Sequence, residues 1–402
     1  QPRFTATAAN IGYFWWSNDI GGHMLGGSDD TMAARWFQLG CFSPINRLHS
    51  SNSGFTSKEP WRYSRDARAT MEAHLRLRHR LVPYLYTWAR RSAGEGIAPV
   101  RPVYHDHPRE LAAYEHRGSF CFGDLLVVPF TSPLDVATGL GRELTWLPDG
   151  VWYDLPTGRR YEATTGGRGR MLSLSRPLDR IGVLARAGSV IPLAGNLTEA
   201  AGDNPRELEI VVVPGGSGSF TLEEDDGSAQ PGQDQIARTH MALTWPEAEE
   251  EDGADVVLRI RLEGAAEVVP ASRLVTVRLL AGQVAGAWLG VGERARRLAT
   301  EEVSGDGFTL GAGTLVHLEE LSRQELIDGV QLVLRGTKHS PADWRDEVHA
   351  ILDAARVEYM AKDLAWDAVQ RGLSGTALLG ELEALGLPET LRAAVAEVLP
   401  HS

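Results

Sequence analysis

The chain has 402 residues, a size at which about two to four domains are expected, and it carries a formal net charge of −13. Its apolar fraction of 43% and charged fraction of 23% are ordinary for a globular protein and exclude a wholly disordered chain. No apolar run reaches the roughly 18 residues that a membrane-spanning helix needs. The excess of acidic groups disfavours nucleic acids and anionic membranes as partners.

Two cysteines, Cys41 and Cys121, are present, and the sequence contains neither a Cys-x-x-Cys pair nor a Cys/His spacing for zinc. The segment 105–107 (His-Asp-His) has the look of a metal site, but two histidines without a third ligand are a weak signal for zinc. We therefore expect no disulfide framework, no metal and no cofactor. The low cysteine content favours a cytoplasmic protein.

The chain opens with Gln1 and passes directly into sequence that looks structured. A basic segment followed by an apolar one, the pattern of a signal peptide, does not occur at this end. Two explanations are open, a processed or trimmed start and a chain that begins in the middle of a domain. We favour the second explanation.

Residues 1–115 alternate between predicted strands and predicted helices. In chain order these are a strand at 11–16, a loop at 17–22, a helix at 30–39, a strand at 41–45, a loop at 47–52 and a helix at 65–91. Asp29 and Asp30 favour the start of the first helix, and Pro83 is expected to kink the second one. This alternation is typical of a parallel α/β fold.

Short predicted strands follow after residue 115. They lie at 125–128, at 146–154 around a turn, at 208–213 and at 256–263, with hairpin turns predicted at 226–227 and 305–307 and a solvated acidic loop at 247–252. The alternation of apolar and polar residues at 256–263 predicts a strand with one buried face. Strands at this spacing suggest β-sandwiches. The final part returns to helix, with an N-terminus predicted at 340–343.

Three polar side chains directly follow the predicted strands of the first part. Asp19 follows the strand at 11–16, and Arg47 and His49 follow the strand at 41–45. In a parallel barrel the active site is built from loops at the C-terminal ends of the strands, so these side chains would face one pocket. The aromatic walls of that pocket would come from Trp15, Trp16, Phe42 and Trp61. Such a combination suits a sugar. The alternative, in which Asp19 caps a turn and His49 is a packed histidine, stays open.

Five segments occur together in an order and spacing that are specific to one enzyme family. They are 19–23 (Asp-Ile-Gly-Gly-His), 35–40 (Arg-Trp-Phe-Gln-Leu-Gly), 42–44 (Phe-Ser-Pro), 47–49 (Arg-Leu-His) and 59–61 (Glu-Pro-Trp). They resemble the later half of the catalytic barrel of glycoside hydrolase family 31, which holds α-glucosidases and α-xylosidases. The segments that resemble its last barrel helix and its following β-domain are 77–86, 123–129, 152–154 and 186–192.

The resemblance implies a mixed α/β and all-β fold. A C-terminal remnant of a (β/α)8 barrel at 1–115 would be followed by a proximal β-sandwich at 116–195, a distal β-sandwich at 196–325 and a helical tail at 326–402. The resemblance also implies that Asp19 and His49 hydrogen-bond the sugar, with Trp16 and Arg47 at neighbouring pocket positions.

Family members are retaining enzymes that use two aspartates, a nucleophile in a Trp-x-Asp-type motif and an acid/base in a Gly-Asp motif. Both precede the stretch that matches this chain, so the resemblance implies no catalytic residue here. It implies two partners, the missing N-terminal half of the barrel and an oligosaccharide or glycoside substrate. Two hypotheses follow. The chain is part of an α-glycosidase that is inactive by itself, or it is a free-standing carbohydrate-binding or scaffold protein that lost catalysis.

Overall fold

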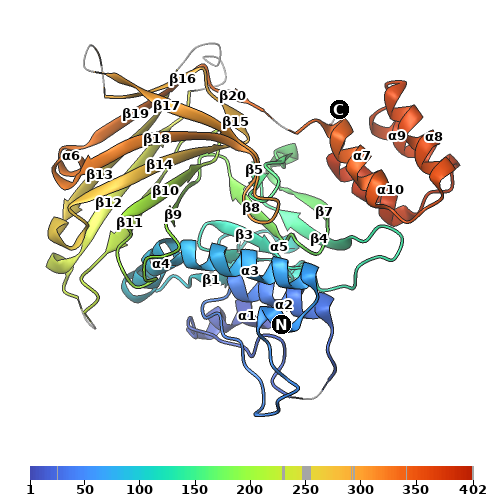
Figure 1. The fold of residues 1–402 in the computed structure, drawn as a ribbon, viewed down its shortest axis with the longest axis horizontal. Helices are drawn as coiled ribbons and strands as arrows, with labels where there is room; N and C mark the ends of the chain where they lie inside the picture. Colours follow the sequence, from blue (N-terminus) through green and yellow to red (C-terminus); the bar gives the residue numbers. More distant parts are fainter. Residues whose placement is uncertain are drawn as a thin grey trace.

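The computed structural model describes residues 1–24, 26–228, 231–246, 255–290, 292, 295–340 and 342–400. Helices near the N-terminus lie at one end of the molecule, a six-stranded sheet lies in the middle, and a strongly curved ten-stranded sheet lies at the other end (Figure 1). Four C-terminal helices are set to one side. The fold is thus a mixture of helical and sheet parts with a helical tail, as the sequence predicts. The predicted acidic loop at 247–252 lies outside the described residues.

The N-terminal part is mostly helical. Its elements are α1 (Pro2–Thr7), the 3-10 turn η1 (Ala8–Ile11), α2 (Asp30–Cys41), the 3-10 turn η2 (Pro60–Arg62), α3 (Arg65–Arg80) and α4 (Val82–Glu95). Asp29 is the N-cap of α2, because its carboxylate accepts a hydrogen bond from the Met32 N–H at 2.8 Å. The predicted break at Pro83 is confirmed. This proline lies in the first turn of α4, where its missing N–H is tolerated.

The two strands predicted in this part do not form, and both predictions are wrong. Ile11 ends η1 with 83% of its surface exposed, and Gly12 ends that turn at a φ of 74°. Cys41 is the last residue of α2, and residues 42–45 form a turn. The isolated parallel bridge between Ile20 and Leu48 lies outside both segments, in the loops that follow them. A strand needs hydrogen-bonded neighbours along its length, and residues 11–16 and 41–45 have no strand partner among the described residues.

The middle part is a six-stranded sheet in the order β1-β2-β3-β8-β5-β6, with a separate β4–β7 pair. Its elements are β1 (Val100–Pro102), η3 (Val103–His105), α5 (Leu111–Glu115), β2 (Phe120–Phe122), β3 (Leu125–Val128), β4 (Gly141–Leu147), β5 (Val151–Asp154), β6 (Arg160–Glu162), η4 (Thr165–Gly167), β7 (Arg170–Arg176) and β8 (Gly182–Arg186). The strands predicted at 125–128 and around the turn in 146–154 are confirmed, although β4 and β5 pair with different partners.

The curved sheet has the order β11-β12-β13-β19-β16-β17-β18-β14-β10-β9. Its strands and the elements between them are β9 (Val190–Ala194), β10 (Glu207–Val212), β11 (Gly218–Glu224), η5 (Gln233–Gln235), β12 (Ala237–Thr244), β13 (Val256–Gly264), η7 (Ala266–Val268), β14 (Ser272–Leu280), β15 (Gly282–Gln283), β16 (Gly286–Leu289), β17 (Arg296–Val303), β18 (Gly313–Ser322), α6 (Arg323–Asp328), β19 (Val330–Arg335) and β20 (Lys338–His339). The sheet curls so far that β9 also contacts β11 and β12. The alternation predicted for β13 is confirmed, since its apolar residues are buried and its arginines exposed.

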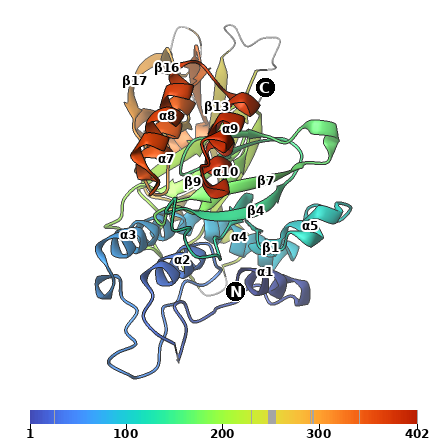
Figure 2. The same cartoon turned by 90° about the vertical axis from the view of Figure 1, so that its right-hand side faces the viewer.

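The C-terminal helices begin later than the sequence indicates, because β19 and β20 lie within the range predicted as a helical tail. The helices are α7 (Trp344–Ala354), α8 (Tyr359–Gln370), α9 (Gly375–Ala384) and α10 (Glu389–Val398). They share a separate apolar core, and α10 packs against β7 (Figure 2). The N-cap of α7 is Asp343, in place of the predicted start at Ser340. The four domain ranges remain predictions.

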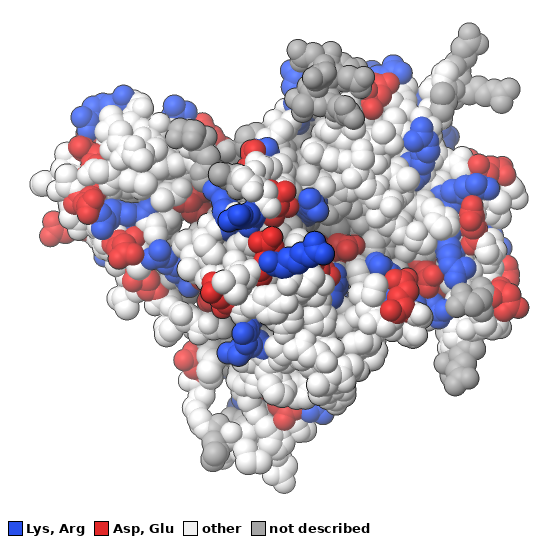
Figure 3. All heavy atoms as spheres, turned by 180° about the vertical axis from the view of Figure 1, so that it is seen from behind, with Lys and Arg blue, Asp and Glu red and all other residues white. Residues whose placement is uncertain are grey.

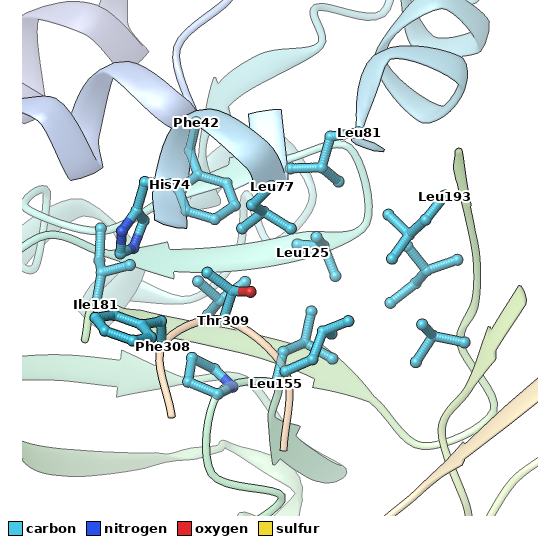
Figure 4. Close-up of a pocket in the computed structure, with 15 residues that line it drawn as sticks. Phe42, His74, Leu77, Leu81, Leu125, Leu155, Ile181, Leu193, Phe308 and Thr309 are labelled. Carbon is cyan, nitrogen blue, oxygen red and sulfur yellow. The ribbon is translucent and has the colours of Figure 1, made fainter. Parts of the chain in front are cut away.

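One continuous apolar core joins the N-terminal helices to both large sheets. Figure 4 shows a small cavity inside this core, where His74 and Leu77 of α3 face Ile181 and the loop residues Phe308 and Thr309 that precede β18. Each part buries its apolar face against the others. The N-terminal helices are therefore held in a fixed position relative to the sheets.

The surface carries charges of both signs. Figure 3 shows acidic and basic side chains interspersed over one face of the molecule, without a continuous basic area on that face. Within the described ranges, no helix combines the length and the apolar character that crossing a bilayer requires.

Candidate functional site

The candidate site is built on two loops that meet at the bridge between Ile20 and Leu48. The Ile20 N–H donates to the Arg47 carbonyl at 3.2 Å, and the Ile20 side chain is 1% exposed. Ile20 packs with Phe37 of α2 and Met71 of α3 in a small apolar cluster. This cluster fixes the position of Asp19, which directly precedes Ile20, and of His49, which directly follows Leu48.

Asp19, Arg47 and His49 come together as the sequence predicts, and His23 joins them. The Asp19 carboxylate forms an ion pair with the Arg47 guanidinium, and its other oxygen lies 3.4 Å from His23 Nδ1. The His23 and His49 rings stack with their centroids 4.7 Å apart. These side chains are partly exposed, at 28% for Asp19 and 52% for Arg47. They present one carboxylate, one guanidinium and two imidazoles to solvent, a set that can accept and donate hydrogen bonds to hydroxyl groups.

The predicted aromatic walls are only partly present. Trp16 contacts Phe4 and Tyr13 through its ring, at centroid distances of 4.9 and 5.7 Å. Phe42 does not line a pocket next to Asp19, because it is 1% exposed and packs in the main core against Phe122. Trp61 is 65% exposed. Of the four predicted site residues, the structure therefore brings Asp19, Arg47 and His49 into one cluster and places Trp16 in a separate aromatic group.

The donor atoms of Asp19, His23 and His49 lie within 4.8 Å of one another, and these residue types can bind zinc. The lone pairs of an imidazole lie in the ring plane. Rings that stack at an interplanar angle of 23° therefore do not direct both lone pairs towards one point. The arrangement favours hydrogen bonding over metal coordination, and the expected absence of a metal remains a prediction.

Sequence analysis missed three contributors to the site. His23 lies four residues after Asp19, a spacing that places both on one turn. Lys58 donates from its ammonium group to the Gly21 carbonyl at 2.8 Å, and Trp36 Nε1 donates to Asn18 Oδ1 at 2.8 Å. His23 directly follows the Gly21-Gly22 turn, and this local pattern could have predicted its place in the cluster. The other two contacts join residues that are 18 or more positions apart in the chain, and no local pattern predicts them.

Two regions of the chain match known families. Residues 2–88 match the glycosyl hydrolases family 31 TIM-barrel domain, and residues 96–191 match the glycosyl hydrolase family 31 C-terminal domain. The chain is 30% identical over 244 residues to an α-xylosidase from Saccharolobus solfataricus, which covers 59% of this chain and 31% of that protein. It is 27% identical over 258 residues to the lysosomal α-glucosidase of Mus musculus, which covers 60% of this chain and 26% of that protein.

Solved structures of family 31 enzymes resemble the fold of this chain. An α-xylosidase from Xanthomonas citri aligns with a TM-score of 0.54 at 27% identity, over 66% of this chain and 28% of that chain. A dextranase from Flavobacterium johnsoniae, solved with isomaltotriose, aligns with a TM-score of 0.65 over 83% of this chain and 41% of that chain. Its identity of 19% makes this second likeness one of fold alone. The chain spans between about a quarter and a third of the length of these two curated relatives.

Proposed function

Because the chain belongs to glycoside hydrolase family 31, we propose that it is part of a retaining α-glycosidase that hydrolyses terminal α-linked glucose or xylose from oligosaccharides. Its similarity to an α-xylosidase and to an α-glucosidase supports this class of reaction. We further propose a cytoplasmic location, which is supported by two buried cysteines that form no disulfide.

The proposed role of the N-terminal part is to bind the sugar in the cleavage subsite. The observation that carries this role is the cluster of Asp19, Arg47 and His49, whose members flank the parallel bridge between Ile20 and Leu48. In a barrel, loops at one end of the parallel strands hold the active site. Asp19 accepts hydrogen bonds from sugar hydroxyls, His49 and Arg47 donate or accept at neighbouring hydroxyls, and Trp16 forms part of the apolar wall.

The catalytic pair is proposed to lie outside this chain, on the N-terminal half of the barrel. A retaining mechanism needs two carboxyls about 5–5.5 Å apart, one as nucleophile and one as acid/base. The cluster of Asp19, His23, Arg47 and His49 contains a single carboxylate. The chain alone is therefore expected to bind a sugar without cleaving it. The same observation favours the second candidate function, a non-catalytic carbohydrate-binding or scaffold protein of this family.

Two measurements test the proposal. Calorimetric titration with glucose and with xylose should detect binding that Asp19→Asn weakens at least tenfold, because the variant loses the charged acceptor. Glu95→Gln, an exposed change on α4, is the matched control and should bind as the unchanged chain does. Equal affinity of the unchanged chain and Asp19→Asn contradicts the role of Asp19.

The second measurement is the release of nitrophenol from nitrophenyl α-glucoside and α-xyloside by the purified chain. No release above background is expected. Turnover at an ordinary enzymatic rate would show that a catalytic pair is present in this chain. Recovery of turnover when the chain is mixed with the N-terminal half of a family 31 barrel would favour the enzyme over the binding protein.

A further inference from the structure

A cavity of about 490 Å³ lies where α4, the six-stranded sheet and the ten-stranded sheet meet. Its wall includes Tyr84 of α4, Arg101 of β1, Trp152 of β5 and Ser219 of β11. The cavity and the Asp19 cluster share no residue. Its volume falls within the range of about 300–1,000 Å³ that is typical of small-molecule sites.

The Asp124 carboxylate lines this cavity without a hydrogen-bond partner among the described residues. Its backbone N–H donates to Tyr84 Oη at 2.7 Å, but among the described residues no side chain or N–H group forms a hydrogen bond or ion pair with its carboxylate. The Asp124 side chain is exposed, and partial desolvation by the surrounding protein raises the pKa of its carboxyl above the ordinary value against the opposing charges of Arg101 and Arg91. An exposed carboxylate without a protein donor can accept hydrogen bonds from a ligand.

The neighbouring Arg101 does not fill that role. Its guanidinium, 7% exposed, forms a two-point ion pair with Asp106, at 2.9 and 2.7 Å. This pair occupies the carboxylate of the His-Asp-His segment at 105–107. Its second histidine, His107, lies edge-on to Trp146 and also lines the cavity.

A single unpaired cation complements Asp124. Arg186, at the end of β8, lines the cavity and forms no ion pair with any described residue. Burial lowers the pKa of His107, and the positive charge of Arg186 lowers it further. The positive charge of Arg101 balances the negative charge of Asp106. The charges of Arg186 and Asp124 balance in the same way. The cavity therefore has no net charge with His107 neutral, but it keeps one strong acceptor and one strong donor.

The remaining wall is apolar with several small polar groups. Leu126, Val190 and Ile191 form an apolar surface, and Ser189, Ser217 and Ser219 add hydroxyls. Gly188 has a φ of 86°, and a side chain there would lie 2.6 Å from the Ser217 carbonyl. The glycine thus allows the turn between β8 and β9 to approach β11 and close this side of the cavity.

We propose that this cavity is a second saccharide-binding site, and that it binds a neutral mono- or disaccharide. Asp124 accepts hydrogen bonds from adjacent hydroxyls, Arg186 donates to others, and the apolar surface contacts a ring face. A net charge of zero disfavours ligands that carry a charge of either sign. The site does not depend on the proposed role of Asp19, because the two share no residue.

The test is a titration of the full chain with glucose and with isomaltose. Binding is measured by calorimetry and by saturation-transfer NMR. Glucuronate and glucosamine serve as charged probes. The variants are Asp19→Asn, Asp124→Asn and Arg186→Gln, the last two also combined with Asp19→Asn, and Asp367→Asn on α8 is the distant control. Asp124→Asn leaves the backbone contact with Tyr84 in place, and Arg186 is exposed, so both variants are expected to fold.

Residual binding that persists in Asp19→Asn, and that falls at least tenfold further when Asp124→Asn or Arg186→Gln is added to Asp19→Asn, supports the second site. The control is expected to bind as the unchanged chain does, and the charged probes are expected to bind at least tenfold more weakly than glucose. Complete loss of binding in Asp19→Asn, or no further loss when Asp124→Asn and Arg186→Gln are each added to Asp19→Asn, overturns it. Tighter binding of either charged probe overturns the assignment to a neutral ligand.

Discussion

The carboxylate of Glu397 on α10 pairs with the guanidinium of Arg176 on β7, and the two side chains are 1% and 2% exposed. The same carboxylate accepts hydrogen bonds from Tyr161 Oη at 2.6 Å and from the Ser175 N–H at 2.6 Å, and it also pairs with Arg159. Residues more than 200 positions apart thus join the C-terminal helices to the middle part of the molecule. These helices have their own core, and this polar contact helps to hold them against β7.

Glu397→Ala is expected to destabilise the chain by about 1–3 kcal/mol, because it removes the acceptor that the buried Tyr161 hydroxyl and Ser175 N–H share, although Arg176 keeps its ion pair with Asp154. Chemical unfolding measures this loss, and limited proteolysis ahead of α7 shows whether the helices are released. The matched control is Glu389→Ala on the same helix. Its pair with Arg142 is 76% and 43% exposed and should contribute about 0–1 kcal/mol. Equal effects of the two substitutions would contradict the anchoring role of Glu397.

His74 makes stability depend on pH. It is fully buried on α3, its Nδ1 lies 2.7 Å from the Thr70 carbonyl, and its Nε2 has no partner among the described residues. Burial lowers its pKa from 6.5 to about 4. The unfolded chain therefore takes up this proton first as the pH falls. The contribution of neutral His74 is complete above pH 6.5 and decreases as the pH falls towards 4, by about 2 kcal/mol at pH 5.

Urea unfolding at pH 7.5 and pH 5 tests this expectation. Two variants without a titrating group at this position, His74→Gln and His74→Phe, should lose about 2 kcal/mol less between the two pH values than the unchanged chain does. Two variants are used because either could be strongly destabilised in the apolar surroundings that Figure 4 shows. An equal loss in all folded proteins would assign the pH dependence to other groups.

Gly123→Ala is expected to be strongly destabilising. The glycine has a φ of 59°, and a side chain there would lie 2.3 Å from both Trp88 Nε1 and Tyr84 Oη. Both rings are rigid and almost completely buried, so they cannot move aside. Gly139→Ala is the control, because its φ of 69° imposes the same backbone strain without a neighbour within 4 Å. We expect about 1–2 kcal/mol for the control and at least about 1 kcal/mol more for Gly123→Ala, measured by unfolding.

Gly40→Ala is expected to disturb the Asp19 cluster without touching it. A side chain at position 40 would lie 2.3 Å from Ile20 Cδ1, so Ile20 and the adjacent Asp19 must shift. Binding of glucose or xylose should weaken, and stability should fall by about 1–3 kcal/mol. Gly94→Ala on the exposed side of α4 meets no atom within 4 Å and should stabilise the chain by about 0.5–1 kcal/mol. Unchanged binding by Gly40→Ala would show that Ile20 does not position the site.

The sequence by itself determined the features that depend on neighbouring residues. The alternation in β13 places one face of that strand in the core, Asp29 begins α2, and Pro83 separates α3 from α4. The spacing of the segments around Asp19 and His49 was enough to identify the family. Local propensity and motif spacing are properties of short stretches, and they persist whatever the rest of the chain does.

Only the tertiary structure decided which of the predicted strands form. Residues 11–16 and 41–45 have the apolar character of strands, but a strand also needs partners, and the isolated parallel bridge between Ile20 and Leu48 lies outside both segments. Phe42 was expected beside the sugar and lies in the main core instead. The cavity at Asp124 and the contact between Glu397 and Arg176 also arise from segments far apart in the chain. Burial and hydrogen-bond pairing depend on these distant segments, and no local pattern contains that information.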